Sequence, residues 1–306
     1  MDILWPIALG SVFVAILWHV LAPRYQENRA ERLLQRGRDR QAAQYLERVH
    51  KVWVRRDGEN SIQAASALAT LARIRFLQGA SEAGTAHLDR AAKSVYAYKG
   101  RPNRRLIVAL IRLGQAALAA QRHAEAAAIG DKARALAGRV LYGADPCLAA
   151  LEAMLGDAHA GLLLFDEAHA HYDRALEIFR LHAGVDSPDA AVVMAAMAVA
   201  MVRQERWKEA RETGMEAVEI LDQHDSARLP EALSALAELH ARRGRFAEAE
   251  GLRLSICHLW ERLGGSDSVL LAREYERRAE LLRSMERQTE AGYLQGKAER
   301  IRRAVA

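Results

Sequence analysis

The chain has 306 residues, of which 51% are hydrophobic, 6% aromatic and 27% charged, with a formal net charge of +5. This composition suffices for a packed protein, and it lacks the basic stripe interleaved with aromatic residues that a nucleic-acid groove requires. The two cysteines, Cys147 and Cys257, lie far apart and outside any CxxC motif, so no disulfide framework is expected.

The first element is an apolar segment over residues 3–22, which contains no Asp, Glu, Lys or Arg. As a helix it would be about 30 Å long, the thickness of the hydrocarbon core of a bilayer. Trp5 and Trp18 lie near its two ends, where amphipathic rings favour the membrane interface. The segment therefore has the length and the flanks of a transmembrane helix.

Two other interpretations of this segment are a cleaved signal peptide and a buried core helix. A signal peptide needs a basic start, which is missing here, and Pro23 directly follows the candidate cleavage site. A core helix would be unusually apolar on every side. We therefore predict an uncleaved anchor as a first domain, residues 1–23, and a second domain over residues 24–306.

The flanking charges predict the orientation of this anchor. No Lys or Arg precedes it, and six arginines follow it: Arg24, Arg29, Arg32, Arg36, Arg38 and Arg40. Positive charge is retained on the cytoplasmic side, so we expect a single-pass protein of the cytoplasmic membrane with the second domain in the cytoplasm. The same arginines either contact anionic lipid or only solvate the first helices, and the sequence leaves both interpretations open.

Beyond the anchor, helical patterns come in pairs. Gly, Asp, Asn, Ser and Pro separate the pairs, as expected where one helix ends and the next begins. In chain order the predicted pairs cover residues 24–57, 61–98, 103–142, 146–182, 187–224, 229–263 and 268–303.

Small residues recur in step along these pairs. One marker opens each second helix: Ala42, Gly84, Ala126, Ala168, Ala210, Ala249 and Ala291. Another small residue stands twelve positions earlier: Ala30, Ala72, Gly114, Gly156, Ala198, Ala237 and Ala279. A third register, seven positions later, is mostly Ala: Val49, Ala91, Ala133, Ala175, Ala217, Ile256 and Ala298. A period of 42 residues, with one step of 39, predicts a solenoid of stacked helical hairpins.

These residues resemble a tetratricopeptide repeat, in the roughly 42-residue form of kinesin light chains and many bacterial proteins. The matching signature reads Leu236-Ala237-Glu238-Leu239 and then Gly244-Arg245-Phe246-Ala247-Glu248-Ala249. The resemblance covers about residues 26–303. It implies an all-α fold, a right-handed α-solenoid of about seven antiparallel hairpins, here preceded by one transmembrane helix.

The resemblance also implies a binding surface. Homologues typically grip peptides in the concave groove, often with Asn on the first helix of each hairpin. The corresponding positions here are Glu31, Arg73, Gln115, Asp157, Val199, Glu238 and Glu280, and none of them is Asn. We expect Arg73, Gln115, Asp157 and Glu238 to face a partner of mixed charge, or else to be ordinary exposed helix residues.

The sequence contains no convincing pattern of catalytic or metal-binding residues. His169 and His171 are about 200° apart on a helix, so they do not converge on one ion. No Ser or Cys nucleophile has a placed His partner, and the Gly-Gly-Ser-Asp turn at 264–267 lacks the end of a phosphate-binding loop. We predict a protein without catalytic activity, cofactor or metal.

The main hypothesis is a membrane-anchored scaffold that binds a protein or peptide through its concave face, with the anchor raising the local concentration of the partner. A second hypothesis is a regulator whose superhelix tightens around a peptide or small effector. A third places the repeats outside the cytoplasm, in envelope biogenesis. The oligomeric state stays open.

Overall fold

The computed structural model describes residues 29–266 and 268–305, and every regular element within these ranges is a helix. Residues 29–35 are helical and lead into α2. The helices that follow are α2 (Asp39–Asp57), α3 (Ile62–Leu77), α4 (Ser81–Ala97), α5 (Arg104–Ala119), α6 (His123–Ala137), α7 (Pro146–Gly161), α8 (Phe165–Ala183), α9 (Pro188–Arg203), α10 (Trp207–Gln223), α11 (Leu229–Arg242), α12 (Phe246–Gly264), α13 (Val269–Ser284) and α14 (Gln288–Val305).

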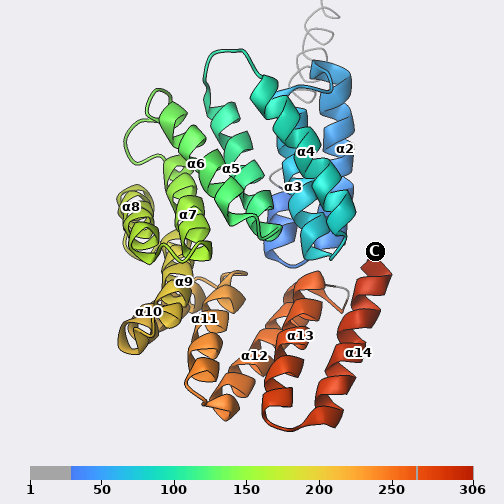
Figure 1. The fold of residues 1–306 in the computed structure, drawn as a ribbon, viewed down its shortest axis with the longest axis vertical. Helices are drawn as coiled ribbons and strands as arrows, with labels where there is room; N and C mark the ends of the chain where they lie inside the picture. The colour runs from blue at the N-terminus through green and yellow to red at the C-terminus, as the bar shows by residue number, and fades with distance from the viewer. Residues whose placement is uncertain (1–28, 267, 306) are drawn as a thin grey trace, which may run out of the picture.

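These helices form seven hairpins within the described ranges. The helix over residues 29–35 precedes α2, and the others pair as α3–α4 and onward to α13–α14 (Figure 1). The predicted solenoid of antiparallel hairpins is therefore confirmed. The predicted anchor over residues 3–22 lies outside the described residues. In residues 29–266 and 268–305, none of the helices combines the length and the apolar character needed to cross a bilayer.

The small residues that predicted the repeat do lie between the helices. Every member of the three registers is buried. At Gly156 on α7, an added Cβ would come within 2.5 Å of the Tyr172 ring on α8. Small side chains thus allow the close approach of paired helices, and large neighbours such as Tyr172 fill the remaining space.

The turn inside each hairpin repeats with the same period. Each contains one residue with a left-handed backbone, five positions before the marker: Gly37, Gly79, Gln121, Leu163, Glu205, Gly244 and Glu286. The steps between these residues are again 42, except for 39 between Glu205 and Gly244. The turn conformation therefore belongs to the repeat, whether or not glycine occupies the position.

The first helices of successive hairpins form the inner row of the solenoid. Helices α3, α5, α7, α9 and α11 pack on one another in order, whereas α13 packs on α12 and α14. The 39-residue step falls on α11, which has 14 residues where α9 and α13 have 16. The array bends round at this point, so that α11 to α14 come to face α2 to α6 (Figure 1).

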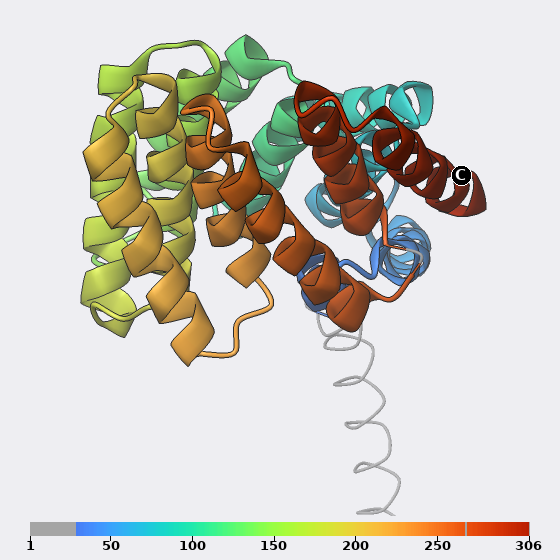
Figure 2. The same ribbon diagram turned by 90° about the horizontal axis from the view of Figure 1, so that it is seen from below.

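The two ends of the array meet and close it into a ring, as the views of Figure 1 and Figure 2 show together. Asp39 Oδ1 accepts a hydrogen bond of 3.1 Å from the backbone N–H of Val269, and Arg38 Nε donates one of 3.3 Å to the Leu263 carbonyl. Arg302 donates to the Leu77 carbonyl at 3.3 Å. We call this contact, between Arg38, Asp39 and Leu77 on one side and Leu263, Val269 and Arg302 on the other, the seam.

The seam is close-packed as well as hydrogen-bonded. A Cβ on Gly37 would lie 2.7 Å from Ser268 Oγ and 3.2 Å from the Trp260 ring. Leu77 packs against the apolar cluster of the last hairpins. Asp39 is 2% exposed, and its carboxylate meets the N-terminal end of α13, where the helix dipole favours a negative charge.

Candidate functional site

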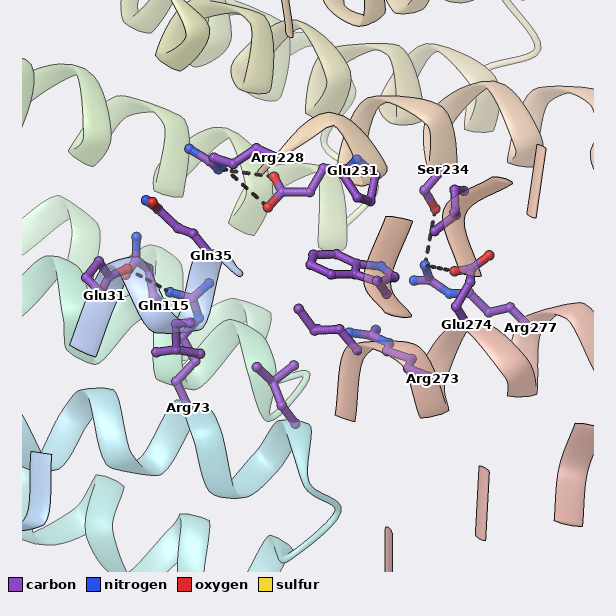
Figure 3. A pocket seen from close by; sticks show the side chains of 16 residues that line it. Glu31, Gln35, Arg73, Gln115, Arg228, Glu231, Ser234, Arg273, Glu274 and Arg277 are labelled. Atoms are coloured by element: carbon purple, nitrogen blue, oxygen red, sulfur yellow. Dashed lines mark hydrogen bonds and ion pairs between the residues drawn. The ribbon is translucent and has the colours of Figure 1, made fainter. Parts of the chain in front are cut away.

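The inside of the ring is hollowed, and the hollow is the main candidate for a binding site. It has two adjoining parts, which we call the first hollow, of about 430 Å³, and the second hollow, of about 630 Å³. Together they form the central cavity. Six residues line both parts: Arg73, Leu77, Gln115, Arg228, Glu231 and Arg273. The central cavity therefore joins the helices on both sides of the seam (Figure 3).

The structure brings three of the four predicted groove residues to this cavity. Arg73 on α3 and Gln115 on α5 line both hollows, and Asp157 on α7 lines the second. Glu238 on α11 is not among the lining residues; it accepts a 2.7 Å hydrogen bond from Arg242. The partner-binding role of all four stays a prediction.

On α11 and α13, the residues that line the cavity are not those that the repeat predicted, Glu238 and Glu280. Ser234 and Glu231, one and two helical turns before Glu238, line the first hollow. Helix α13 contributes Arg273 and Arg277. The predicted groove positions lie eleven residues before each marker. This register assumes that every hairpin has the same orientation relative to the inside of the solenoid. The shortened step at α11 breaks this assumption. The 39-residue step was therefore the signal in the sequence that other residues of α11 and α13 face the cavity.

The charged side chains of the cavity are balanced in number. The arginines are Arg73, Arg228, Arg273, Arg277 and Arg302, and the carboxylates are Glu31, Asp157, Glu231, Glu274 and Glu276. Four arginine–carboxylate pairs account for most of them, and the distances are 3.7 Å for Arg73–Glu31, 3.1 Å for Arg228–Glu231, 3.6 Å for Arg277–Glu274 and 2.6 Å for Arg302–Glu276. Three of these pairs are drawn in Figure 3. Arg273 and Asp157 are left over.

Asp157 lies within the ring, on the wall of the second hollow. Its side chain is exposed to the solvent of the cavity, and the helices of the ring place much protein around that cavity. The Tyr172 hydroxyl donates a 2.8 Å hydrogen bond to Asp157 Oδ1. Burial raises the pKa of the Asp157 carboxyl to about 6, although the hydrogen bond from Tyr172 acts in the opposite direction. No cation within the described ranges forms an ion pair with it.

Arg273 is the corresponding cation. It makes no hydrogen bond or ion pair with any residue of the described part of the chain, and Figure 3 shows its guanidinium without a partner. Desolvation lowers the pKa of Arg273, and the neighbouring charges of Arg277 and Arg302 lower it further. An arginine is effectively always charged in proteins, so Arg273 presents to the cavity a positive charge that forms no ion pair, with the carboxylates of Glu276 and Glu274 acting on it from further away.

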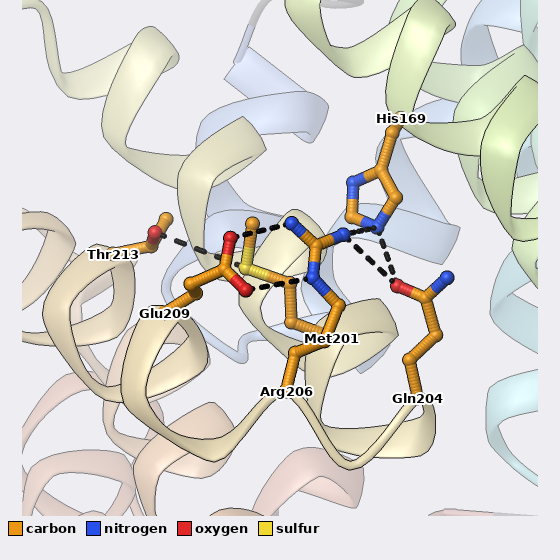
Figure 4. A network of polar contacts seen from close by, with 6 residues as sticks. All are labelled: His169, Met201, Gln204, Arg206, Glu209 and Thr213. Atoms are coloured by element: carbon orange, nitrogen blue, oxygen red, sulfur yellow. Dashed lines mark hydrogen bonds and ion pairs between the residues drawn. The ribbon is translucent and has the colours of Figure 1, made fainter.

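The histidines considered for a metal site lie elsewhere and have other partners. His169 Nε2 lies 2.7 Å from Gln204 Oε1 and 3.1 Å from the Arg206 guanidinium, in the turn between α9 and α10 (Figure 4). His171 is buried on α8 and lies 2.6 Å from Glu152 Oε2. The first contact ties α8 to the turn of the next hairpin, and the second ties α8 to α7. No group of three or more metal-ligating side chains is found among residues 29–266 and 268–305.

Comparison with known proteins supports the fold. Residues 147–223, from α7 to α10, match the tetratricopeptide repeat family. No curated protein sequence matches the chain. The structure is similar to that of a Rap protein complexed with Competence and Sporulation Factor, at 15% identity and a TM-score of 0.65, covering 93% of this chain and 76% of the other.

Two further solved structures are similar. One is NprR in complex with its cognate peptide NprX, at 14% identity and a TM-score of 0.53, covering 86% of this chain and 77% of the other. The other is a kinesin light chain with nearly identical tetratricopeptide-like repeats from Podospora anserina, at 18% identity and a TM-score of 0.50, covering 68% and 98%. These likenesses, with the family match, confirm the predicted resemblance to tetratricopeptide repeats and a solenoid fold.

Proposed function

We propose that this protein is a non-enzymatic binding module that holds a peptide, or a peptide-like segment of a protein, in the central cavity. The observation that carries the proposal is a continuous hollow to which the inner helices on both sides of the seam contribute polar side chains. Its two parts fall within the range of about 300 to 1,000 Å³ typical of pockets for small ligands. A folded domain is too large for such a space, whereas an extended segment fits.

Two of the similar structures were solved with a bound partner, and the one that is named a peptide favours a peptide over another small ligand. The Rap protein was solved with Competence and Sporulation Factor, and NprR with the peptide NprX. We propose no catalytic step, because the sequence pairs no nucleophile with a placed base. Burial also raises the pKa of the Cys147 and Cys257 thiols, to about 11 and about 12, which keeps both in the unreactive thiol form.

The proposal is tested by blocking the cavity. The full chain, purified in detergent, is presented with a random peptide library, and the enriched peptides are measured by fluorescence anisotropy. Val199, which is 37% exposed on the wall of the second hollow, is replaced by Trp. The matched control is Leu181→Trp, at a 72% exposed position on α8 outside the cavity lining. We expect Val199→Trp alone to abolish binding. Equal binding to both variants would show that the peptide site is elsewhere.

We further propose that residues 3–22 anchor the module in the cytoplasmic membrane, with the repeats in the cytoplasm. The support is the uncharged 20-residue segment and the arginines that follow it. Because both cysteines are buried, labelling them does not report the side of the membrane. A reporter fused after Ala306 does, and activity of an exported reporter would instead favour the envelope role. Extraction of the full chain by carbonate would contradict the anchor.

The seam favours a second candidate, a regulator whose ring responds to its ligand. The first hollow is lined by Glu31 and Gln35 from one end of the array and by Arg273 and Trp260 from the other. A ligand that contacts both ends binds the closed ring better than an opened one, and thereby shifts the population toward closure. A peptide from the library should then raise the melting temperature and slow hydrogen exchange at the seam. If a ligand binds without slowing hydrogen exchange at the seam, the regulator hypothesis is rejected and the scaffold hypothesis is kept.

A further inference from the structure

The two unpaired charges of the central cavity define the kind of ligand it holds. Asp157 on α7 and Arg273 on α13 both line the second hollow. One comes from the middle of the inner row and the other from the far side of the seam. Each is exposed to the cavity and forms no ion pair among residues 29–266 and 268–305. A ligand that brings a charge of opposite sign to each of them can form two charge-assisted contacts without breaking an existing ion pair of the cavity.

The other charges of the cavity do not take these two roles. Arg228 approaches both Glu231 and Asp189, at 3.1 and 3.8 Å, and Arg302 holds Glu276 with two hydrogen bonds of 2.6 and 2.8 Å. Glu274 is shared between Arg277 and the buried Arg253, the latter at 2.8 Å. A ligand group would have to break these pairs to use their members. Arg273 needs no such rearrangement, and Asp157 gives up no ion pair.

The space around the two charges is suited to a peptide. Helix α9 contributes an apolar wall of Val192, Ala195, Ala196 and Val199. Gln115 on α5 and Gln121 in the turn after it contribute polar side chains. Asp157 and the other carboxylates would repel a purely anionic ligand, and Arg273 would repel a purely cationic one. The lining therefore disfavours ligands of a single sign.

We propose that the second hollow binds a dipolar peptide segment, which directs a carboxylate to Arg273 and an ammonium or guanidinium group to Asp157, with apolar side chains against α9. This inference rests on the peptide-binding function proposed above. The carboxylate comes from the C-terminus of the peptide or from an acidic side chain, and the cation from the N-terminus or from a basic side chain. Arg273 can donate two parallel N–H hydrogen bonds to a carboxylate, which fixes the direction of the carboxylate.

The pH dependence of binding follows from the surroundings of Asp157. The groups that face it are the Tyr172 hydroxyl from α8, Arg228 and Glu231 near the start of α11, and Arg73 from α3. Since the pKa of Asp157 is about 6 in the ligand-free protein, its negative charge is present above that pH and lost below it. A cationic group on the ligand should therefore bind less tightly as the pH falls from 7 to 5, and Asp157→Asn should remove this dependence.

The test uses the full chain in detergent and four pools of fluorescent tetrapeptides. The pools have free termini, an acetylated N-terminus, an amidated C-terminus, or both ends capped with an internal Lys and Glu. Arg273→Gln should weaken pools that carry a carboxylate, and Asp157→Asn those that carry an ammonium, by about tenfold or more each, since charge-assisted hydrogen bonds are lost. Arg273→Lys should restore part of the affinity. Comparison of the capped pools identifies which groups of the peptide supply the charges.

Matched controls separate charge in the cavity from charge in general. Arg262→Gln on α12 and Asp173→Asn on α8 remove the same charges from exposed positions outside the cavity lining. Circular dichroism and melting establish that each variant is folded. If peptides bind in the cavity, by the Val199→Trp test, but lose no affinity in Arg273→Gln and Asp157→Asn, the dipolar ligand is wrong and the binding function stands. If no peptide binds the unaltered protein, both proposals fail.

Discussion

Gly156 lies where a single methyl group has no room. A Cβ there would approach two carbons of the Tyr172 ring at 2.5 and 2.6 Å, and Tyr172 is 1% exposed and hydrogen-bonded to Asp157. The ring is therefore unable to move aside without breaking a buried contact. The close approach of α7 and α8 depends on the absence of a side chain at this position.

Replacing Gly156 by Ala should destabilise the protein by about 1 to 3 kcal/mol, the usual cost of overpacking, despite the better helix propensity of Ala. The same substitution at Gly251 on α12, where a Cβ meets nothing within 4 Å, should stabilise by about 0.5 to 1 kcal/mol. Urea unfolding followed by circular dichroism measures both changes. If Gly156→Ala shifted the midpoint upward, the tight packing of Tyr172 would be disproved.

Asp157 also affects stability in the absence of ligand. Its pKa is about 6 in the folded protein and 3.8 in the reference state, so the folded chain keeps this proton to a higher pH than the unfolded chain. Between these values the unfolded state binds fewer protons, and the free energy of unfolding falls as pH rises. The contribution of protonated Asp157 to the free energy of unfolding is lost between about pH 4 and about pH 6. Above that pH, Asp157 causes no further change.

The variant Asp157→Asn should not show this loss. Urea midpoints of the two proteins should lie close together at pH 4, diverge in favour of Asp157→Asn up to about pH 6, and then run parallel. Taking the difference between the proteins cancels the titration of all other groups. A constant difference from pH 4 to pH 8 would mean that the pKa of Asp157 is the same in the folded and the unfolded protein, and would contradict the raised value.

The hairpin turn is the element whose conformation the repeat fixes most strictly. Seven turns within the described residues have one left-handed residue each, but only Gly37, Gly79 and Gly244 are glycines. A residue with a Cβ pays about 1 to 2 kcal/mol for this conformation. The other four turns therefore carry strain, which the packing of the adjoining helices offsets.

Leu163→Gly should relieve this strain and stabilise the protein by about 0.5 to 1 kcal/mol, since Leu163 is 60% exposed and buries little apolar surface. Leu181→Gly, at a 72% exposed position within α8, should destabilise it by about 1 kcal/mol. Melting curves of the two variants should move in opposite directions. A lower melting temperature for both would indicate that the Leu163 side chain makes a contact that matters.

The elements could be predicted from the sequence to a large extent, and the binding surface only in part. Spacing of small residues predicted seven hairpins, because close helix packing depends on residues near one another in the chain. The same spacing brought Arg73, Gln115 and Asp157 to the cavity. It did not predict Arg273, because the position of α13 depends on how the shortened α11 turns the array, which is a sum of small rotations over many hairpins.

The ring as a unit depends on a few contacts between distant parts of the chain. Asp39 and Val269 are 230 positions apart, and their hydrogen bond is buried. Gln78 also donates to Asp39, at 3.4 Å. The bond to Val269 satisfies a backbone N–H at the start of α13 that closure of the ring would otherwise leave without a partner.

Asp39→Ala should open the ring. It leaves the Val269 N–H without its acceptor, which costs about 1 to 3 kcal/mol in the closed form and nothing once water reaches the group. Small-angle scattering should show a larger radius of gyration, and hydrogen exchange should be faster at residues 263–269. Asp57→Ala at the exposed end of the same helix serves as the control. An unchanged radius for Asp39→Ala would show that close packing at Gly37 suffices.

A closed array also restricts how this gene can change. An open solenoid can be lengthened or shortened by duplication or loss of a unit, because each unit contacts only its neighbours. Here a hairpin inserted between Asp39 and Leu263 would push Leu263 and Val269 past Arg38 and Asp39, and loss of one there would leave them out of reach. The copy number of the repeat is thus set by geometry, and homologous recombination between units should yield chains that fold locally but expose two unmatched ends.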